Sequence, residues 1–375
     1  MIQNLEISNY RLFSSFHIDS LAQVNLIVGN NNSGKSSLLE AVHLLTTDDL
    51  RSSLLYILSE RGEIATRAID SRYGRSRSVI YQIAHLFHNR SVKSGQRFHI
   101  FTQGNSKYIS LNIVLQGAVY PENEDLYQPS LFEERDEIID DMFEEPSYLL
   151  FERRENGVEL PKERLRLTGD GILIDNRLYG VRKAVYSRGG SRLLTTNYIG
   201  FDELATLWDK ITLTPKEDKV VEAMQILEPR VERISFTSSQ ASNSGILLRL
   251  KGESDPIPLG SMGDGMRRIL AIIASLVSVD SGTLLVDEID TGLYHSALVN
   301  MWRLVLETSV RQGAQVWATT HSWDCVQAFQ QALEDYGKPE VGKLIRLEKF
   351  DDQIQAVHYS ASELEIAVEQ QIEVR

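Results

Sequence analysis

The sequence has only one cysteine and no apolar segment of the length that a membrane-spanning helix needs. The single cysteine, Cys325, excludes an intramolecular disulfide and a zinc site built from cysteines, and we expect it to be a buried structural thiol. The longest apolar run, 269–279, is shorter than the roughly 20 residues that cross a bilayer. The N-terminus alternates apolar and polar residues and lacks the basic flank and apolar block of a signal peptide. We therefore expect a cytoplasmic protein without a membrane partner.

Positive charge is also scarce, because 39 Lys and Arg residues stand against 52 Asp and Glu residues, for a net charge of −13. This balance argues against a surface coated in positive charge for nucleic acid. The charge is unevenly distributed, since residues 120–148 are dense in acids, whereas 51–101 and 153–192 are rich in Arg and Lys. Each run is most often a solvated face. The acidic run would suit a basic partner or mimic DNA, the basic stretches would suit DNA, and the sequence does not choose between them.

No repeat, low-complexity tract, Pro- or Gly-rich linker or sustained heptad pattern divides the 375 residues. Strand and helix patterns alternate at both ends, which predicts an α/β fold with a mixed or parallel sheet flanked by helices. We expect antiparallel strands at the N-terminus and a mainly helical, basic segment over 51–95. The predicted parts are an N-terminal part over 1–116, a helical or irregular insertion over 117–230 and a C-terminal part over 231–375.

The stretch GNNNSGKSS fits the phosphate-loop pattern G-x-x-x-x-G-K-[ST], and it lies between an apolar strand pattern and a helical pattern. The two glycines let the backbone wrap closely, and the backbone amides and the helix N-terminus can bind phosphates. Lys35 supplies positive charge and Ser36 a hydroxyl for magnesium, whereas the alternative is an ordinary Gly/Asn turn. The predicted ATP-binding residues of this loop are Gly29, Asn30, Asn31, Asn32, Ser33, Gly34, Lys35, Ser36 and Ser37.

A second motif, LLVDEID at 284–290, predicts a buried strand that ends in two acids. Asp287 is expected to hold magnesium, directly or through water, and Glu288 to polarise the attacking water. The alternative for such an acid pair is a solvated turn. Compact GTPases and simple kinases place their acidic motif much nearer to the phosphate loop. The long separation between Lys35 and Asp287 therefore indicates an ATPase head that is split by an insertion.

The stretch PLGSMGDGMRRIL, at 258–270, places glycines and a serine before a helix and predicts a second anion-binding helix start. It resembles LSGGQ, the signature motif of ABC-type ATPases. In that superfamily, the signature of one subunit covers the nucleotide that the phosphate loop of the other subunit holds. The equivalent residues here are Ser261, Met262, Gly263, Asp264 and Gly265.

Two further motifs agree with this resemblance. Asp290 and Gly292 follow the acid pair, where the superfamily has its D-loop. His321 in TTHS follows an apolar strand, as the family's switch histidine does, and would sense the terminal phosphate and position the water; the alternative is a structural histidine.

The N-terminal stretch NYRLF resembles the family's first-strand motif. Arg11 would touch the nucleotide, and the alternative is an exposed strand arginine. Gln103 and Gln116 are candidates for the family's Q-loop, although a surface polar residue is the better interpretation of either.

Together these motifs resemble the ABC-type ATPases of the AAA15 group, which are relatives of RecF, of SMC heads and of the ATPase half of OLD-family nucleases. The resemblance covers the chain in outline and implies that 1–116 and 231–375 form the ATPase head, with a lever between them. Only about fifty residues follow the HSWDC stretch, which leaves no room for the TOPRIM nuclease domain of OLD proteins. We therefore expect that the chain does not cut DNA itself.

The resemblance implies an ATPase that binds ATP and Mg²⁺ and forms a head-to-tail homodimer, or a higher oligomer, around the nucleotide. Lys35, Glu288 and His321 would be catalytic, and Ser36 and Asp287 would bind the metal. By resemblance alone, the work is on DNA, such as DNA repair, or in anti-phage defence, with a separately encoded nuclease or toxin. The alternatives are a nucleotide-gated scaffold that holds an effector with little turnover and, less favoured, the ATPase subunit of a membrane transporter.

Overall fold

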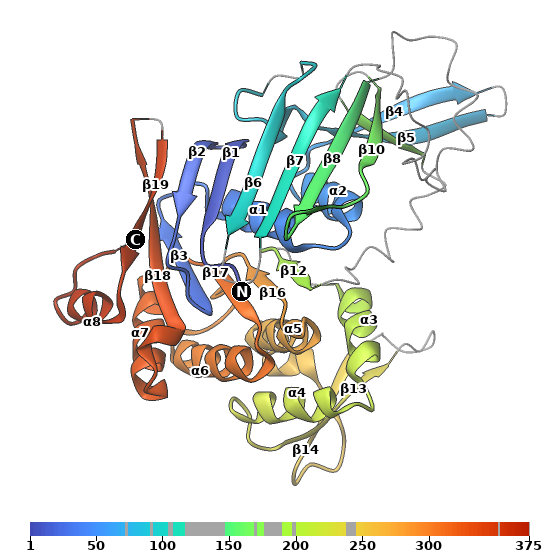
Figure 1. Cartoon of the computed structure of the whole chain (residues 1–375). Helices are drawn as coiled ribbons and strands as arrows, with labels where there is room; N and C mark the ends of the chain where they lie inside the picture. The colour runs from blue at the N-terminus through green and yellow to red at the C-terminus, as the bar shows by residue number, and fades with distance from the viewer. Residues whose placement is uncertain are drawn as a thin grey trace.

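The chain folds into two large sheets, one antiparallel and one mostly parallel, with helices between and beside them (Figure 1). No helix in the described part of the chain is long and apolar enough to cross a membrane. The computed structural model describes residues 1–71, 74–90, 93–103, 108–116, 147–168, 171–175, 190–196, 200–237, 245–351 and 353–374.

The mostly parallel sheet has six strands, and only its last pair is antiparallel. Every residue of β3, β16 and β17 is buried, which is why these strands appear in the sequence as apolar-rich runs. The strand order puts β17 between β3, which precedes the phosphate loop, and β16, which precedes the two acids. In spatial order the strands are β12 (Ser191–Leu194), β16 (Thr283–Val286), β17 (Gln315–Thr319), β3 (Val24–Gly29), β18 (Gly342–Phe350) and β19 (Gln353–Tyr359).

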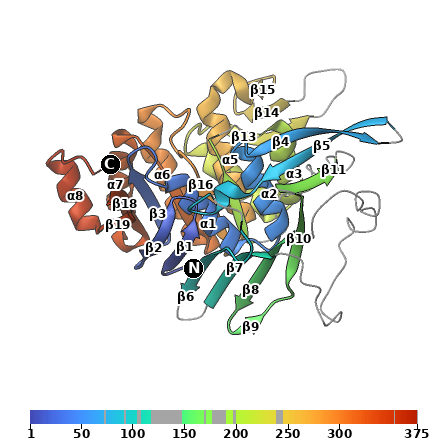
Figure 2. The ribbon, with the colours of Figure 1, turned by 90° about the horizontal axis from the view of Figure 1, so that it is seen from above.

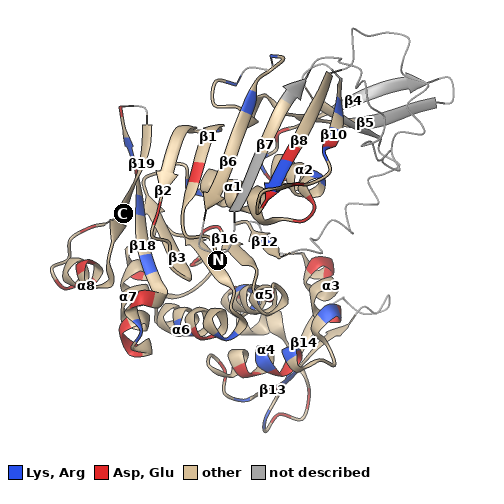
Figure 3. Ribbon diagram, viewed as in Figure 1, with Lys and Arg blue, Asp and Glu red and all other residues tan. Residues whose placement is uncertain are grey.

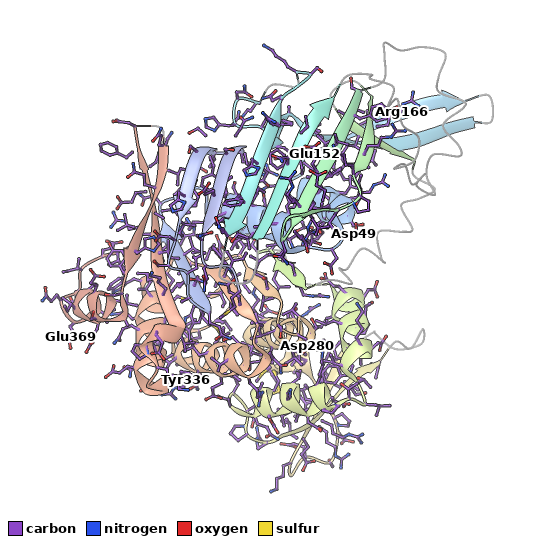
Figure 4. All side chains as sticks on the ribbon, viewed as in Figure 1. Asp49, Glu152, Arg166, Asp280, Tyr336 and Glu369 are labelled. Carbon is purple, nitrogen blue, oxygen red and sulfur yellow. The ribbon has the colours of Figure 1, made fainter. Side chains whose placement is uncertain are left out.

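This sheet separates two hydrophobic cores. On one face, Leu26 and Val28 pack with the apolar sides of helices α5 and α6. On the other face, Ile27 and Trp317 pack with α1 and the antiparallel sheet, and Figure 4 shows the side chains that fill both spaces. The helices, in chain order, are α1 (Lys35–Thr46), α2 (Leu50–Glu60), α3 (Phe201–Ile211), α4 (Pro215–Gln225), α5 (Asp264–Ser278), α6 (His295–Gln312), α7 (Trp323–Tyr336) and α8 (Ala361–Glu369).

The antiparallel sheet lies over the other side of α1, so that this helix is enclosed by both sheets. Its far end is a hairpin, β4–β5, that reaches away from the rest of the molecule (Figures 1 and 2). In spatial order its strands are β2 (Phe13–Ile18), β1 (Leu5–Tyr10), β6 (Arg97–Gln103), β7 (Tyr108–Gln116), β8 (Ser147–Glu155), β10 (Glu163–Thr168), β11 (Gly171–Asp175), β5 (Gly74–Gln82) and β4 (Ile64–Ser71), and β9 (Val158–Glu159) pairs with β8.

A smaller sheet leads into helix α5. It consists of β13 (Val231–Thr237), β14 (Gly245–Leu250) and β15 (Ile257–Pro258), and a 3₁₀ turn, η5 (Leu259–Met262), joins it to α5. Helices α3 and α4 pack against α5 on the same side of the molecule. Acidic and basic residues are interspersed along α4 (Figure 3), as expected for a solvated helix face.

The prediction of a mainly helical segment over 51–95 is wrong beyond α2. The chain forms the β4–β5 hairpin instead, and only a short 3₁₀ turn, η1 (Ala84–Leu86), follows it. Val79, Tyr81 and Ile83 are buried while the residues between them are more exposed, so the apolar pattern here has the period of a strand. Pairing of β5 with β11, which is distant in the sequence, stabilises this arrangement.

The segment expected to be an insertion contributes more strands than its sequence indicated. Its described residues include β8, β10 and β11 of the antiparallel sheet and β12 of the parallel sheet, followed by α3 and α4. Most of the acidic run, residues 120–146, lies outside the described residues. The division at 116/117 and 230/231 stays a prediction.

Candidate functional site

The phosphate loop turns sharply between β3 and α1, and glycine is required at both of its ends. Gly29 has φ 145°, and a Cβ there would lie 2.5 Å from the carbonyl oxygen of Leu347 on β18. Gly34 has φ 95°, and a Cβ there would lie 3.0 Å from Phe13 Cζ and from Ile354 Cδ1. Larger residues would therefore be strained in conformation and would collide with neighbouring strands.

Lys35, the first residue of α1, folds its side chain back over this loop. Its Nζ donates to the carbonyl oxygens of Gly29, at 2.8 Å, and Asn30, at 2.9 Å. Burial lowers the pKa of the Lys35 ammonium to about 8, and the negative charges of Asp287 and Glu288 act in the opposite direction. The positive charge is thus held by neutral carbonyl groups within the electrostatic reach of the two acids.

The remaining loop residues divide into an exposed crest and a buried base. The crest is formed by the three asparagines, of which Asn32 has the left-handed φ of 61°. Ser33 and Ser37 are buried, Ser36 is half-buried, and Arg61 Nη2 donates to Ser37 Oγ at 3.4 Å. The crest residues are Asn30, Asn31 and Asn32.

The two acids lie directly after β16, where Thr319 at the end of neighbouring β17 contacts both. The Thr319 hydroxyl donates to Asp287 Oδ1 at 2.5 Å and accepts from the backbone N–H of Glu288 at 2.8 Å. Thr291 Oγ1 donates to Glu288 Oε2 at 3.3 Å. Glu288 itself has φ 46°, in the left-handed region that non-glycine residues seldom adopt.

His321 and the D-loop residues join this edge through β17. His321 Nε2 lies 3.9 Å from Glu288 Oε1. Thr320 Oγ1 donates to Asp290 Oδ1 at 2.6 Å. Because β3, β17 and β16 are adjacent and parallel, their carboxyl ends bring the phosphate loop, the histidine and the acids to one edge of the sheet.

The signature-like stretch forms η5 and the first turn of α5. Ser261, Gly263 and Asp264 are exposed, Met262 is half-buried, and the helix begins directly after Gly263. The fifth signature residue, Gly265, lies against the D-loop, since a Cβ on it would be 3.1 Å from the carbonyl oxygen of Gly292.

Arg268, one turn further along α5, was not predicted from the sequence. Its guanidinium donates to the backbone oxygens of Asp287, at 2.9 Å, Glu288, at 3.3 Å, and Thr195, at 3.1 Å. The helix that begins at the signature is thereby tied to the backbone of the two acids.

Arg11 is buried, so it is not the exposed strand arginine that the sequence left as an alternative. Its guanidinium donates to both Glu63 carboxylate oxygens, at 2.7 and 3.1 Å, and lies 2.6 Å from Glu40 on α1. Arg61 contacts the other oxygen of Glu40, also at 2.6 Å. Contact between Arg11 and a nucleotide stays a prediction.

Of the other predicted residues, Cys325 is buried and burial raises the pKa of its thiol to about 12, in keeping with a structural role. Gln103 is exposed at the end of β6, and Gln116 ends β7 with its side chain outside the described residues. Thr319 was not predicted from the sequence, although a threonine at the end of a mostly apolar strand is a signal that could have identified it.

The donors at this edge fit a magnesium–nucleotide. Ser36 and Asp287 offer hydroxyl and carboxylate oxygens, which are the ligands that Mg²⁺ prefers. In the described ranges, no group of three or more His, Cys, Asp or Glu residues is arranged to hold a metal by itself. A cation bound to so few protein oxygens also needs phosphate or water oxygens, which is the usual arrangement for magnesium with a nucleotide.

Comparison with known proteins gives results at three levels. One family, described as "AAA domain, putative AbiEii toxin, Type IV TA system", matches residues 24–324. An "ATP/GTP phosphatase" of Helicobacter pylori is 23% identical over 97% of this chain and 97% of its own length. A "DNA replication and repair protein RecF" of a Marinomonas species is 55% identical over 42 residues, 11% of each chain. A crystal structure of an SMC head bound to the C-winged helix domain of ScpA covers 97% of this chain and 99% of its own, with TM-score 0.50 and 14% identity.

The family match runs from the start of β3 to the start of α7. It therefore includes the phosphate loop, the signature-like stretch, the two acids and the histidine together, and the SMC head shares the fold that carries them. The chain belongs to this AAA-domain family and is an ABC-type ATPase that matches RecF over a short stretch and shares its fold with an SMC head.

Proposed function

We propose that the chain binds ATP with Mg²⁺ at 29–37, hydrolyses it, and dimerises head to tail around two nucleotides. The observation that carries the proposal is the meeting of Lys35, Glu288 and His321 at the carboxyl ends of three adjacent parallel strands. A loop cation that neutralises phosphate charge and polar groups that orient the attacking water are parts that phosphoryl transfer to water commonly uses.

In the proposed reaction, Lys35 and the amides of the phosphate loop neutralise negative charge on the outer phosphates. Magnesium, held by Ser36 and Asp287, supplies further charge neutralisation on the phosphate oxygens. The Glu288 carboxylate orients the attacking water and accepts its proton, and His321, beside it at 3.9 Å, positions the water and the terminal phosphate.

The proposed dimer would use surfaces that are exposed in one chain. Ser261 and Gly263 are exposed beside the N-terminus of α5, whose first backbone N–H groups have no partners within the helix. Tyr294, at the end of the D-loop, is 71% exposed. In a head-to-tail pair these groups would cover the nucleotide of a second copy, with Asn30 to Asn32 at the same boundary.

The names of the relatives support a cellular role on DNA or in anti-phage defence, with a separate effector protein as partner. RecF is named for DNA replication and repair, the family description refers to a toxin–antitoxin system, and the SMC head structure contains ScpA. We propose such a role, in which ATP-driven closure and opening of the dimer would change the state of DNA or of the effector.

Replacement of Glu288 by Gln tests the enzymatic proposal. We expect phosphate release to fall by about 100-fold or more, with ATP binding retained and a dimer trapped in the presence of ATP. Phosphate-release kinetics and light scattering after size exclusion measure the two effects. Glu307→Gln, at an exposed position of α6, is the matched control.

A Glu288→Gln protein that stays monomeric and hydrolyses ATP at the wild-type rate would refute this role of Glu288. Wild-type protein that binds ATP, dimerises and retains a partner but releases almost no phosphate would instead support the nucleotide-gated scaffold.

A further inference from the structure

The carboxyl end of β17 carries two threonines that have no exposed surface, Thr319 and Thr320. Apart from Gln315 at its start, the rest of β17 is apolar, and hydroxyl groups buried at the end of such a strand need hydrogen-bond partners. Their hydroxyl groups bond residues of the loop that follows β16 and the backbone N–H of Ser322.

Thr319 has a double role in this arrangement. Its hydroxyl hydrogen is directed to Asp287 Oδ1, at 2.5 Å, and its oxygen accepts the N–H of Glu288, at 2.8 Å. Its backbone oxygen also accepts the N–H of Ile289 at 2.9 Å. One residue of β17 thus contacts three successive residues of the acidic loop.

The contact with Glu288 occurs at a point of backbone strain. Glu288 has φ 46°, in the left-handed region that is unfavourable for a non-glycine residue. The Thr319 hydroxyl bonds the N–H of this residue, while Thr291 bonds its carboxylate. Both the backbone and the side chain of Glu288 are therefore held by hydroxyl groups.

The contact with Asp287 affects which oxygen is available to a cation. Since Oδ1 accepts the short bond from Thr319, a cation at Oδ1 would compete with this bond, and a cation would bind more readily through Oδ2. Binding through one carboxylate oxygen suits Mg²⁺, which demands near-octahedral geometry, whereas the larger Ca²⁺ also accepts carboxylates through both oxygens.

We propose that Thr319 is a positioning residue that sets the Glu288 carboxylate for the attack of water and restricts Asp287 to one oxygen for the metal. This inference rests on the proposed ATPase function. It predicts a preference for Mg²⁺ over Ca²⁺ that depends in part on a hydroxyl group on the strand between β3 and β16.

The test compares Thr319→Val, which keeps the shape but removes the hydroxyl, with Thr319→Ser, which keeps the hydroxyl. We expect Val to lower kcat by about 10- to 100-fold, because small displacements of a catalytic group are costly, and to leave KM for ATP within about threefold. We expect Ser to restore most of kcat. We also expect the ratio of ATP-analogue affinities in Mg²⁺ and in Ca²⁺ to fall toward one in Val and to stay at the wild-type value in Ser.

Thr102→Val is the matched control, because Thr102 is another buried strand threonine whose hydroxyl donates to a backbone oxygen, that of Asn4, at 2.6 Å. It should reproduce any loss of thermal stability without the change in kcat or in metal preference. Folded Thr319→Val protein with wild-type kcat and wild-type metal preference would overturn the inference. Wild-type protein that binds Mg–ATP without hydrolysing it would refute the proposed turnover, and the metal preference of the Val and Ser proteins would still decide the role of Thr319.

Discussion

Helix α1 carries two buried charged residues a little over one turn apart, Lys35 and Glu40, and they differ in the groups that surround them. The Glu40 carboxylate is 7% exposed and lies 2.6 Å from Arg11 and 2.6 Å from Arg61. Lys35, at the start of the same helix, is 6% exposed and is held by the backbone oxygens of Gly29 and Asn30. The first charge is neutralised by opposite charges, and the second is held by neutral dipoles.

The acids opposite Lys35 follow the second pattern, since Asp287 and Glu288 accept hydrogen bonds from threonine hydroxyls. A charge that the protein has already neutralised has little attraction left for a ligand. A charge that neutral groups hold keeps most of its field, at a cost in desolvation that lowers stability. The comparison separates charges that stabilise the fold from charges that are available for binding and chemistry.

The largest expected effect comes from removal of the available charge. Lys35→Met should weaken ATP binding by about 100-fold, because the charge-assisted contacts to the phosphates are lost. The free energy of unfolding should stay the same or rise, because a buried cation without a counter-charge is removed. Titration with a fluorescent ATP analogue and denaturant melts measure the two quantities. Unfolding of this variant would contradict the inference that the Lys35 charge serves binding rather than stability.

Removal of the neutralised charge, that of Glu40, should lower stability rather than ATP binding. Glu40→Gln removes the carboxylate that buried Arg11 and the more exposed Arg61 share, while Arg11 keeps its contacts to Glu63, so the free energy of unfolding should fall by about 2 kcal/mol. Equilibrium denaturation gives this value. Arg303→Met, which breaks an exposed ion pair with Asp335, is the control and should cost less than about 1 kcal/mol. If Glu40→Gln lowers the free energy of unfolding by no more than this control, the ion pairs of Glu40 with Arg11 and Arg61 contribute little to stability.

The smallest effect is the pH dependence of Lys35. Since burial lowers its pKa to about 8, the wild-type affinity for an ATP analogue should fall above pH 8, by up to about tenfold per pH unit. For stability the sign is reversed. The pKa of Lys35 in the folded state, about 8, is below the ordinary lysine value of 10.5. Burial of the charged ammonium therefore lowers the free energy of unfolding fully below pH 8, and this loss diminishes as the pH rises from 8 toward 10.5. Lys35→Arg, which stays charged, should show a flat affinity profile between pH 7 and 9.5, and an equal slope in both proteins would assign the effect to another group.

The sequence predicted that the phosphate loop and the two acids each follow an apolar-rich strand, and the structure has these strands in one parallel sheet with their carboxyl ends at one edge. It did not indicate the role of Thr319, which depends on β17 lying between β3 and β16, an arrangement of strands far apart in the chain. The pairing of Arg11, in the turn after β1, with Glu40 of α1 likewise depends on a tertiary contact. The local pattern also led to the wrong prediction of helix for β4 and β5, which pair with each other while β5 pairs with the distant strand β11.

The burial of Cys325 has a practical consequence for experiments on this protein. It is the only thiol in the chain and has no exposed surface. Because its pKa is raised to about 12, only a very small fraction of this thiol is deprotonated at neutral pH. A thiol-reactive dye would therefore label an introduced cysteine selectively, without prior removal of the native one. Leu213, 91% exposed between α3 and α4, and Tyr294, 71% exposed beside the D-loop, are two such attachment points. Energy transfer between dyes at these positions would follow the approach of two copies in real time.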